Sequence, residues 1–166
     1  VAAHGRRYRI ELEGGGEVDC MTRGKRSDAA CGDRVLIQMT GSRVGVIESI
    51  EPRRSVFYRS DARREKVIAA NVTQIVVVVA AAPPYSEDLV DRCLAGAEHA
   101  LIGAVLVFNK IDLPQASDAL DALSRYRNLG YPVVALAAKR DLAVLIPHLT
   151  NEVSVLVGQS GMGKST

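Results

Sequence analysis

The last nine residues of the chain, GQSGMGKST, match the pattern G-x-x-x-x-G-K-[ST]. Glycines permit a tight turn whose backbone N–H groups point at phosphate oxygens. A lysine ammonium in this pattern reaches the β- and γ-phosphates, and the hydroxyl after it can bind Mg²⁺. The apolar run at residues 153–157 comes directly before and is typical of a buried strand, the context that such a loop requires. The sequence therefore predicts a phosphate-binding loop with nine candidate nucleotide contacts: Gly158, Gln159, Ser160, Gly161, Met162, Gly163, Lys164, Ser165 and Thr166.

A second motif, NKID, occupies residues 109–112 and follows the apolar run at residues 104–108. Guanine presents an N1–H and an exocyclic amino group side by side, and a carboxylate that accepts from both distinguishes it from adenine. Asp112 is the candidate for that role. Asn109 would bind the purine edge and connect adjacent loops, while the Lys110 stem would lie along the base and Ile111 completes the motif. By itself, the pattern fits equally well a helix-capping turn in which Asp112 precedes Leu113.

The elements expected around these motifs place them together. Residues 74–80 form a nearly continuous β-branched run, typical of a strand covered on both faces, and residues 104–109, 132–137 and 153–157 are similar. Stretches of helical length and spacing lie between them, at residues 87–101, 117–129 and 139–149. This alternation predicts a doubly wound α/β sheet, which binds ligands at the carboxyl ends of its strands. Both motifs would lie at that edge, which favours the guanine interpretation.

A third stretch at the same edge, Ala137, Ala138 and Lys139, could direct backbone N–H groups at the guanine O6. In ordinary GTPases the phosphate loop comes first and the guanine loops come last, whereas here residue 109 precedes residue 158. Only one sheet's worth of strands is available. The order therefore indicates one G domain cut between its usual ends and rejoined, rather than two nucleotide domains.

Residues 1–66 differ from the rest in pattern and charge. Short apolar runs separated by turns, at residues 8–12, 18–21, 35–39 and 44–50, predict an all-β module, and a five-stranded barrel of the oligonucleotide-binding (OB) type suits the length. This stretch holds 14 Lys and Arg against 10 Asp and Glu, while residues 67–166 hold 7 against 9. The split predicts two domains, an OB barrel at 1–66 and a nucleotide domain at 67–166.

Basic residues cluster in the first module and could contact nucleic-acid phosphates, with Phe57 and Tyr58 available to stack on bases. The alternative is a solvated surface whose acids largely cancel these charges, with the aromatic rings in the core. The candidates for RNA binding are Arg6, Arg7, Arg9, Lys25, Arg26, Arg53, Arg54 and Arg59.

The composition excludes several classes of protein. With 48% hydrophobic and 24% charged residues among 166, packed globular structure is expected rather than disorder. The longest apolar runs reach about half of the ~20 residues that span a bilayer, so we expect no membrane segment. Cys20, Cys31 and Cys93 are odd in number and lack metal-ligand spacing. We therefore expect neither a disulfide framework nor a zinc site in this chain, and a reducing, cytoplasmic location.

Taken together, these segments resemble the RsgA (YjeQ) family of circularly permuted GTPases that depend on the small ribosomal subunit. The segments AHGRRYRIE, GDRV, VIAANVTQIVVVVA, LVDRCL, VFNKIDL and GQSGMGKST recur in that family in this order. The resemblance implies an OB-type barrel and a circularly permuted G domain that binds GTP or GDP, with Mg²⁺ bound through the nucleotide at Ser165. It further implies GTP hydrolysis stimulated by the small (30S) subunit, a late role in its maturation, contact with 16S rRNA and a monomeric protein.

The sequence also departs from the family pattern. The third loop usually reads Ser-Ala-Lys, so Ala137 lacks a hydroxyl but keeps its backbone donor, and Thr73 stands where aspartate is common. The family's switch regions, its D-x-x-G motif and its C-terminal domain with Cys and His ligands for Zn²⁺ are not in these residues. We therefore expect no catalytic residue in this chain and no GTP hydrolysis by it alone. Two alternatives are an RNA-binding module indifferent to nucleotide and a P-loop ATPase or kinase with a coincidental NKID.

Overall fold

The computed structural model describes residues 2–4, 7–23, 29–61 and 64–165. The chain divides into two compact units, Val1–Asn71 and Val72–Thr166. The first is built from strands, whereas the helices of the described residues all lie in the second. No helix in the described part of the chain is both long and apolar enough to span a lipid bilayer.

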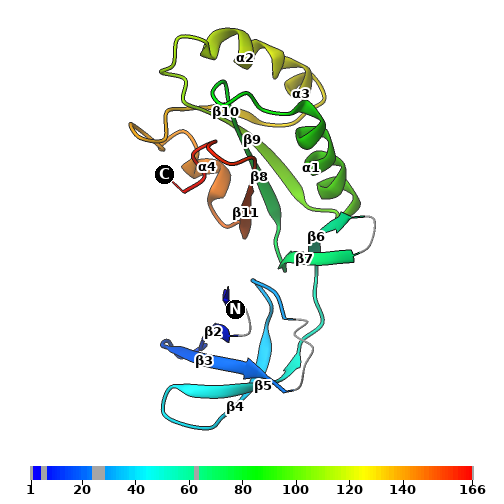
Figure 1. Ribbon diagram of the computed structural model, residues 1–166, viewed down its shortest axis with the longest axis vertical. Coiled ribbons are helices and arrows are strands. Elements are labelled where there is room, and N and C mark those ends of the chain that lie inside the picture. Colours follow the sequence, from blue (N-terminus) through cyan, green and yellow to red (C-terminus); the bar gives the residue numbers. More distant parts are fainter. Residues whose placement is uncertain (1, 5–6, 24–28, 62–63, 166) are drawn as a thin grey trace. The chain divides into compact units, whose positions relative to one another are not determined.

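The first unit contains a five-stranded sheet and a separate hairpin (Figure 1). The sheet has the order β1-β2-β3-β5-β4, with β3 and β5 parallel and the other neighbours antiparallel. Its strands are β1 (Ala2–His4), β2 (Arg7–Glu11), β3 (Glu17–Thr22), β4 (Val35–Met39) and β5 (Val44–Ile50). This OB-like architecture confirms the predicted all-β module. The hairpin of β6 (Val56–Asp61) and β7 (Arg64–Ala70) was not predicted, and its second strand runs on to the end of the unit.

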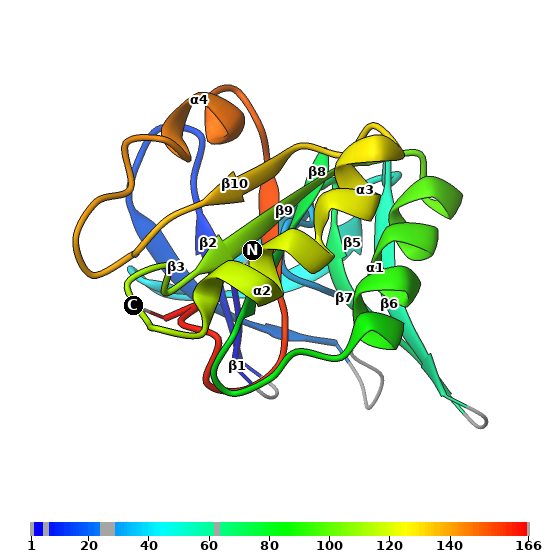
Figure 2. The same cartoon turned by 90° about the horizontal axis from the view of Figure 1, so that it is seen from above.

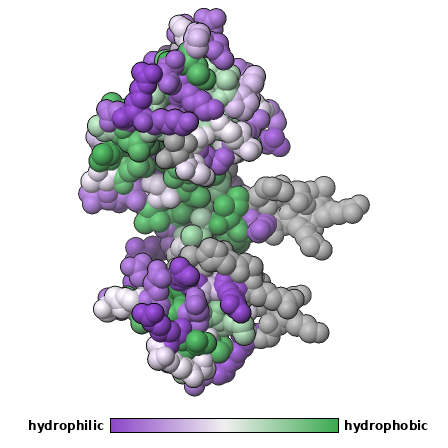
Figure 3. All heavy atoms as spheres, turned by 60° about the vertical axis from the view of Figure 1, so that its left-hand side comes forward, coloured by the Kyte–Doolittle hydropathy of each residue, from purple (hydrophilic) through white to green (hydrophobic). Residues whose placement is uncertain are grey.

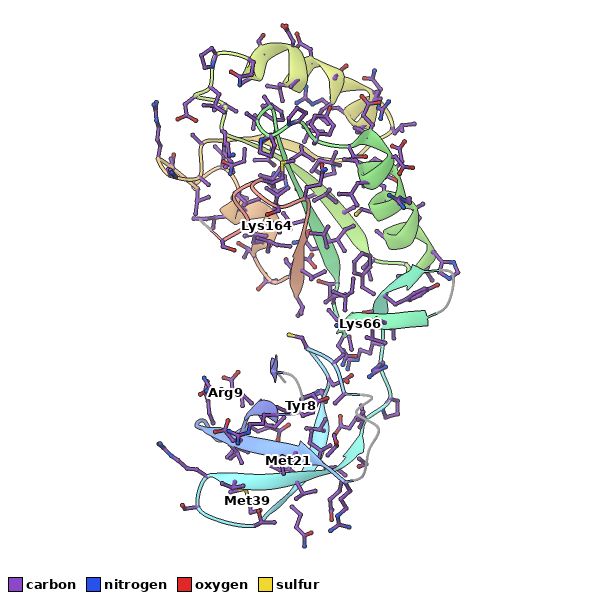
Figure 4. The ribbon with its side chains drawn as sticks, in the orientation of Figure 1. Tyr8, Arg9, Met21, Met39, Lys66 and Lys164 are labelled. Atoms are coloured by element: carbon purple, nitrogen blue, oxygen red, sulfur yellow. The ribbon has the colours of Figure 1, made fainter. Side chains whose placement is uncertain are left out.

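The core of the sheet follows from its alternating pattern. Tyr8 and Ile10 of β2 are buried while their neighbours are exposed, and Val18, Cys20 and Ile47 pack with them. Tyr8 and Arg9 accordingly lie on opposite sides of the strand (Figure 4). Interdigitated apolar side chains on one face are what make such a small sheet stable.

The hairpin contacts the rest of the unit through backbone at Gly32. This residue has φ +88°, and a Cβ there would lie 2.1 Å from the Ala70 carbonyl oxygen, so only glycine fits. Cys31 forms an isolated parallel β-bridge with Ala69, and the Asn71 side chain donates a hydrogen bond to the Gly32 carbonyl. In the hairpin, Phe57 is 7% exposed. The core alternative therefore holds for Phe57, whereas Tyr58 is exposed.

The second unit is a four-stranded parallel sheet in the order β10-β9-β8-β11. The sheet and its helices confirm the predicted α/β architecture. Helices α1, α2 and α3 lie on one face of the sheet and α4 on the other (Figures 1 and 2). The elements are β8 (Gln74–Ala80), α1 (Glu87–His99), β9 (Gly103–Asn109), α2 (Ala116–Ala122), α3 (Ser124–Asn128), β10 (Val133–Ala135), α4 (Ile146–Leu149) and β11 (Ser154–Val157).

Strand β8 is the centre of this unit, and all seven of its residues are buried. On one face Val76 and Val78 pack in a cluster with Val107 of β9, and Leu145 and Leu149 cover it. A run buried on both faces is expected of a parallel strand between helical layers. The sheet therefore forms a well-packed core, and the loops at the carboxyl ends of its strands extend from it.

Polar side chains fix the opposite, amino-terminal end of this sheet. Gln74 is 5% exposed, and its amide donates to the His148 carbonyl at 2.7 Å and to Ser154 Oγ at 2.8 Å. Next to it, Thr73 donates to Glu152 and accepts from the Val153 N–H at 2.9 Å. Thr73 thus helps to align β11 with β8.

Two helix predictions need correction. The helix expected at residues 117–129 is divided into α2 and α3 at Leu123, whose side chain is completely buried. The helix expected at residues 139–149 is reduced to the four residues of α4. Asp141 accepts from the Ala143 N–H at 2.8 Å, and this local turn competes with helix in residues 139–145.

Candidate nucleotide-binding site

Four loops meet at one edge of the second unit. Because β8, β9, β10 and β11 are parallel, their carboxyl ends lie at the same edge of the sheet. The NKID motif begins at the last residue of β9, residues 137–139 follow β10, and the phosphate-binding loop (P-loop) follows β11. The loop after β8, residues 81–86, lies between the NKID motif and the P-loop, because β8 lies between β9 and β11 in the sheet. The structure therefore brings the predicted motifs together.

The P-loop takes its shape from its glycines. Gly158 has φ +146°, and a Cβ there would lie 2.3 Å from the Val78 carbonyl oxygen, so the loop begins in direct backbone contact with β8. Gly161 and Gly163 also have positive φ, of 80° and 92°. Met162 stands between them with a completely buried side chain in the core of the sheet. The loop is thus anchored by one apolar side chain while its backbone stays near the surface.

The charged end of the P-loop folds back on its own backbone. Lys164 Nζ donates to the Gln159 carbonyl oxygen at 2.7 Å, and Figure 4 shows Lys164 beside the loop. An ammonium group has three donors, so this bond leaves others for phosphate. Ser160 and Ser165 are exposed, and Thr166 lies outside the described residues. The glycines, Lys164 and Ser165 together fit a phosphate group with its Mg²⁺.

Asn109 connects the three loops. Its side chain is buried and makes three hydrogen bonds: Nδ2 donates to the Met162 carbonyl at 2.9 Å, and Oδ1 accepts from the N–H groups of Lys110, at 2.8 Å, and Ala138, at 2.9 Å. Nearly all the bonding capacity of the amide is directed at backbone. The side-chain amide of Asn109 therefore connects the three loops, and the Ala138 N–H donates its hydrogen bond to Asn109.

Lys110 adds a second connection to the P-loop. It has φ +63°, and its Nζ donates to the carbonyls of Ala82 at 2.6 Å and Gly161 at 2.7 Å. The carbonyls of consecutive P-loop residues 161 and 162 are therefore bonded by consecutive residues of the NKID motif. The helix-capping alternative does not explain these bonds, because they join segments more than 50 positions apart.

A pocket of about 340 Å³ opens beside this motif, within the size range of small-molecule sites. Asp112 lies in its wall with a side chain 34% exposed, and Arg140 NH2 is 3.6 Å from Asp112 Oδ2. The lining comprises Ala82, Asn109, Lys110, Asp112, Leu113, Ala137, Ala138 and Lys139. Among the predicted residues Ile111 stands apart: its side chain is exposed and its N–H donates to the Leu136 carbonyl at 3.3 Å.

Sequence reasoning did not assign the loop at residues 81–86 to the site. Ala82 lines the pocket, and Gln159 Oε1 accepts from the Ser86 N–H at 2.7 Å. Burial raises the pKa of the Tyr85 hydroxyl in this loop, and the charge of Glu87 raises it further. The available signal was positional, since the loop follows a predicted strand and therefore lies at the ligand-binding edge.

In the layer formed by α1, α2 and α3, the side chain of Tyr126 connects α3 to α1. Its hydroxyl donates to Asp91 Oδ1 at 2.7 Å, and the Arg125 guanidinium lies 4.5 Å from the ring centroid. Burial raises the pKa of Tyr126 to about 12, and the bond to Asp91 acts in the same direction. This cluster stabilises the helical layer behind the site rather than the site itself.

The predicted RNA-binding residues have different surroundings. Arg7, Arg9 and Arg54 are exposed, and Arg9 Nε lies 3.5 Å from Glu17 and 3.8 Å from Asp19. The visible face of this unit, the lower one in Figure 3, mixes hydrophilic and hydrophobic residues. Exposed apolar side chains of the first unit include Met21, Leu36 and Val44. Arg6, Lys25 and Arg26 lie outside the described residues, and Arg59 lies in β6 without a described side chain.

Arg53 has a structural partner. Its Nε donates to Asp33 Oδ1 at 2.7 Å and its NH2 to Oδ2 at 2.8 Å, while the Asp33 side chain is completely buried. Asp33 Oδ2 also accepts from the Ala30 N–H at 2.7 Å. A bidentate pair of this kind commits most of the guanidinium group to contacts within the protein.

No cluster of three His, Cys, Asp or Glu side chains suited to a metal occurs within the described ranges.

A sequence model of the RsgA GTPase family matches residues 50–166. The chain belongs to the RsgA GTPase family. It is 50% identical over its whole length to the small ribosomal subunit biogenesis GTPase RsgA of Nitrosospira multiformis and 49% identical to that of Bordetella pertussis, covering 53% and 57% of those proteins. The chain thus spans about half the length of these RsgA proteins.

Solved structures agree with the RsgA assignment. YjeQ from Thermotoga maritima is similar with a TM-score of 0.70 and 30% identity, over 99% of this chain and 60% of that one. YloQ, described as a circularly permuted GTPase, gives a TM-score of 0.69 and 29% identity over the same shares. The predicted family membership is confirmed.

Proposed function

We propose that the full-length protein is a GTP-binding and GTP-hydrolysing factor in late maturation of the small ribosomal subunit. One observation carries the nucleotide part: Asn109 and Lys110 bond directly to the carbonyls of Met162 and Gly161, which makes the guanine motif and the P-loop one site. The ribosomal part follows from the names of the relatives, small ribosomal subunit biogenesis GTPases.

Each part of this edge has a chemical task in the proposal. Asp112 accepts from the N1–H and amino group of guanine, and the pocket beside it receives the base. The P-loop N–H groups and Lys164 would bind the phosphates, and the Ser165 hydroxyl would be a ligand for Mg²⁺. We assign no catalytic residue to residues 1–166, and place hydrolysis in a protein of the length of the relatives.

The first unit is proposed to contact 16S rRNA, and the boundary of this proposed RNA-binding domain then lies after residue 71, a few residues beyond the division at residue 66 that the sequence suggests. Exposed Arg7 and Arg54 support this role, because they are positioned to meet phosphates from solvent. The proposal includes a cytoplasmic, monomeric protein, and a Zn²⁺ site in the region of the relatives beyond these residues.

Fluorescent GDP and ADP binding to the full-length protein tests the nucleotide assignment. We expect preference for GDP, and loss of that preference in Asp112→Asn, because an amide cannot accept from both guanine donors at once. Asp118→Asn, an exposed acid of α2, is the matched control and should change nothing. Tighter binding of ADP would instead favour a P-loop ATPase or kinase.

Small-subunit binding separates the remaining alternative. We expect affinity for the subunit to differ among GTP, GDP and no nucleotide, and hydrolysis to rise when subunits are added. Binding that is indifferent to nucleotide would favour a pure RNA-binding module.

A further inference from the structure

The loop at residues 81–86 contacts the P-loop in three ways. Gln159 Oε1 accepts from the Ser86 N–H at 2.7 Å, and Lys110 Nζ joins the Ala82 carbonyl to that of Gly161. A Cβ at Gly161 would lie 3.2 Å from Pro83 Cδ, so the Pro83 ring packs closely against the P-loop backbone at Gly161. This loop therefore forms a wall of the P-loop, and α1 begins directly after it.

Both the side-chain oxygen and the main-chain oxygen of Gln159 accept hydrogen bonds at this wall. Its side-chain oxygen accepts from Ser86, and its main-chain oxygen accepts from Lys164 Nζ at 2.7 Å. Ser86 is in turn the N-cap of α1, because its Oγ accepts from the Leu89 N–H at 3.3 Å. A continuous series of hydrogen bonds thus leads from the first turn of α1 through Gln159 to the phosphate-binding lysine.

We propose that Gln159 is a positioning residue, whose side chain fixes the P-loop against the N-cap of α1 and thereby places Lys164 for the β-phosphate. The inference rests on the proposed nucleotide-binding function and deepens it. Position 159 is variable in the general P-loop pattern, so the pattern itself assigns this side chain no task. A side chain without an acceptor would leave the Ser86 N–H unpaired and the loop less ordered, and ordering it would then weaken phosphate binding.

The test compares two variants of the full-length protein that divide the functions of this junction. Gln159→Met keeps the length of the side chain but removes its acceptor. Ser86→Ala keeps the N–H that donates to Gln159 but removes the Oγ cap of α1. Fluorescent GDP and GMP are the probes, because only GDP carries the β-phosphate that Lys164 binds. Thermal unfolding is measured in parallel.

We expect Gln159→Met to weaken GDP binding about three- to tenfold, the range for one net hydrogen bond, and to leave GMP binding unchanged. Ser86→Ala should lower the unfolding temperature, since it removes a helix cap, and should change the GDP to GMP affinity ratio less than Gln159→Met does, because the N–H that donates to Gln159 is kept. A merely structural role of Gln159 predicts that both variants lower stability and that GDP and GMP affinities fall together.

The outcomes separate this inference from the function on which it rests. Wild-type protein that shows no GDP preference over ADP would overturn the proposed function. Wild-type preference for GDP, with a Gln159→Met affinity ratio equal to that of wild type, would overturn only the positioning role.

Discussion

The candidate binding residues of the two units differ in what their side chains contact. In the unit Val72–Thr166, the side chains of Asn109, Lys110 and Gln159 each bond to backbone atoms of another loop. In the unit Val1–Asn71, Arg9 and Arg53 instead face carboxylates of other side chains. Bonds to backbone define the path of a loop, whereas an exposed ion pair such as that of Arg9 with Glu17 leaves it largely unconstrained.

This difference explains why one set of residues was easier to interpret than the other. A motif such as NKID is restricted in residue type because each position serves one geometric need, so the pattern itself carries information. A group of arginines records only charge, and exposed ion pairs contribute about 0–1 kcal/mol and are screened by salt. Arg53 and Arg54 are adjacent in sequence, yet one is bound to a buried acid and the other is exposed.

The largest effect is expected for Asn109→Ala. The change removes three hydrogen bonds and leaves the Met162 carbonyl and the Ala138 N–H without their partner, which should destabilise the second unit by about 2–4 kcal/mol. Urea unfolding followed by helical circular dichroism reports this unit, because the described helices all lie in it. Asn128→Ala, at an exposed position of α3, is the control. Equal stability of the two variants would contradict the connecting role of Asn109.

An intermediate effect is expected for Asp33→Ala in the first unit. The buried carboxylate accepts from Arg53 and Ala30, and its removal should cost about 2–3 kcal/mol, because Arg53 is partly exposed and can recover some hydration. Hydrogen exchange measured by mass spectrometry should show faster exchange around Ala30 and Arg53, with α1 unchanged. Glu13→Ala removes an exposed partner of Arg34 and should have little effect. Comparable changes in both variants would remove the distinction between buried and exposed pairs.

The smallest effect is expected for Arg7→Gln combined with Arg54→Gln. If both side chains bind phosphates, RNA binding should weaken, and the slope of log affinity against log salt should flatten by roughly one unit for each phosphate that is no longer neutralised. Arg127→Gln, exposed in α3 of the second unit, is the control. Fold stability should not change in any of these variants. An unchanged salt slope would count against the first unit as the RNA surface.

Sequence reasoning succeeded where local pattern and tertiary environment agree. Residues 74–80 were predicted as a doubly covered strand and form β8 with the same bounds, because a β-branched run fits only such a place. The hairpin of β6 and β7 was missed, since its junction with the sheet depends on the close approach at Gly32. Residues 139–145 were predicted as helix because their spacing is helical, but the side chain of Asp141 supports a turn.

The candidate site was predictable to a similar degree. Its motifs could be placed at one edge, because parallel strands share that edge, and the structure brings them there. The hydrogen bond between Gln159 and Ser86 could not be predicted, since the two residues are 73 positions apart and neither pattern requires the other. Binding of guanine by Asp112 stays a prediction.

The order of the motifs along the chain also has a consequence for protein synthesis. A ribosome that makes this chain releases β8, α1, β9 and β10 before it reaches the P-loop, so the guanine-side loops emerge first. Asn109 and Met162, which are joined by a hydrogen bond, lie 53 positions apart. At a synthesis rate of about 5–20 residues per second, the Met162 carbonyl is made several seconds after the Asn109 amide that donates to it. During that interval the nascent G domain has no phosphate cradle, and nucleotide cannot assist its earliest co-translational folding. The sheet has to begin assembling on the strength of its apolar strands alone.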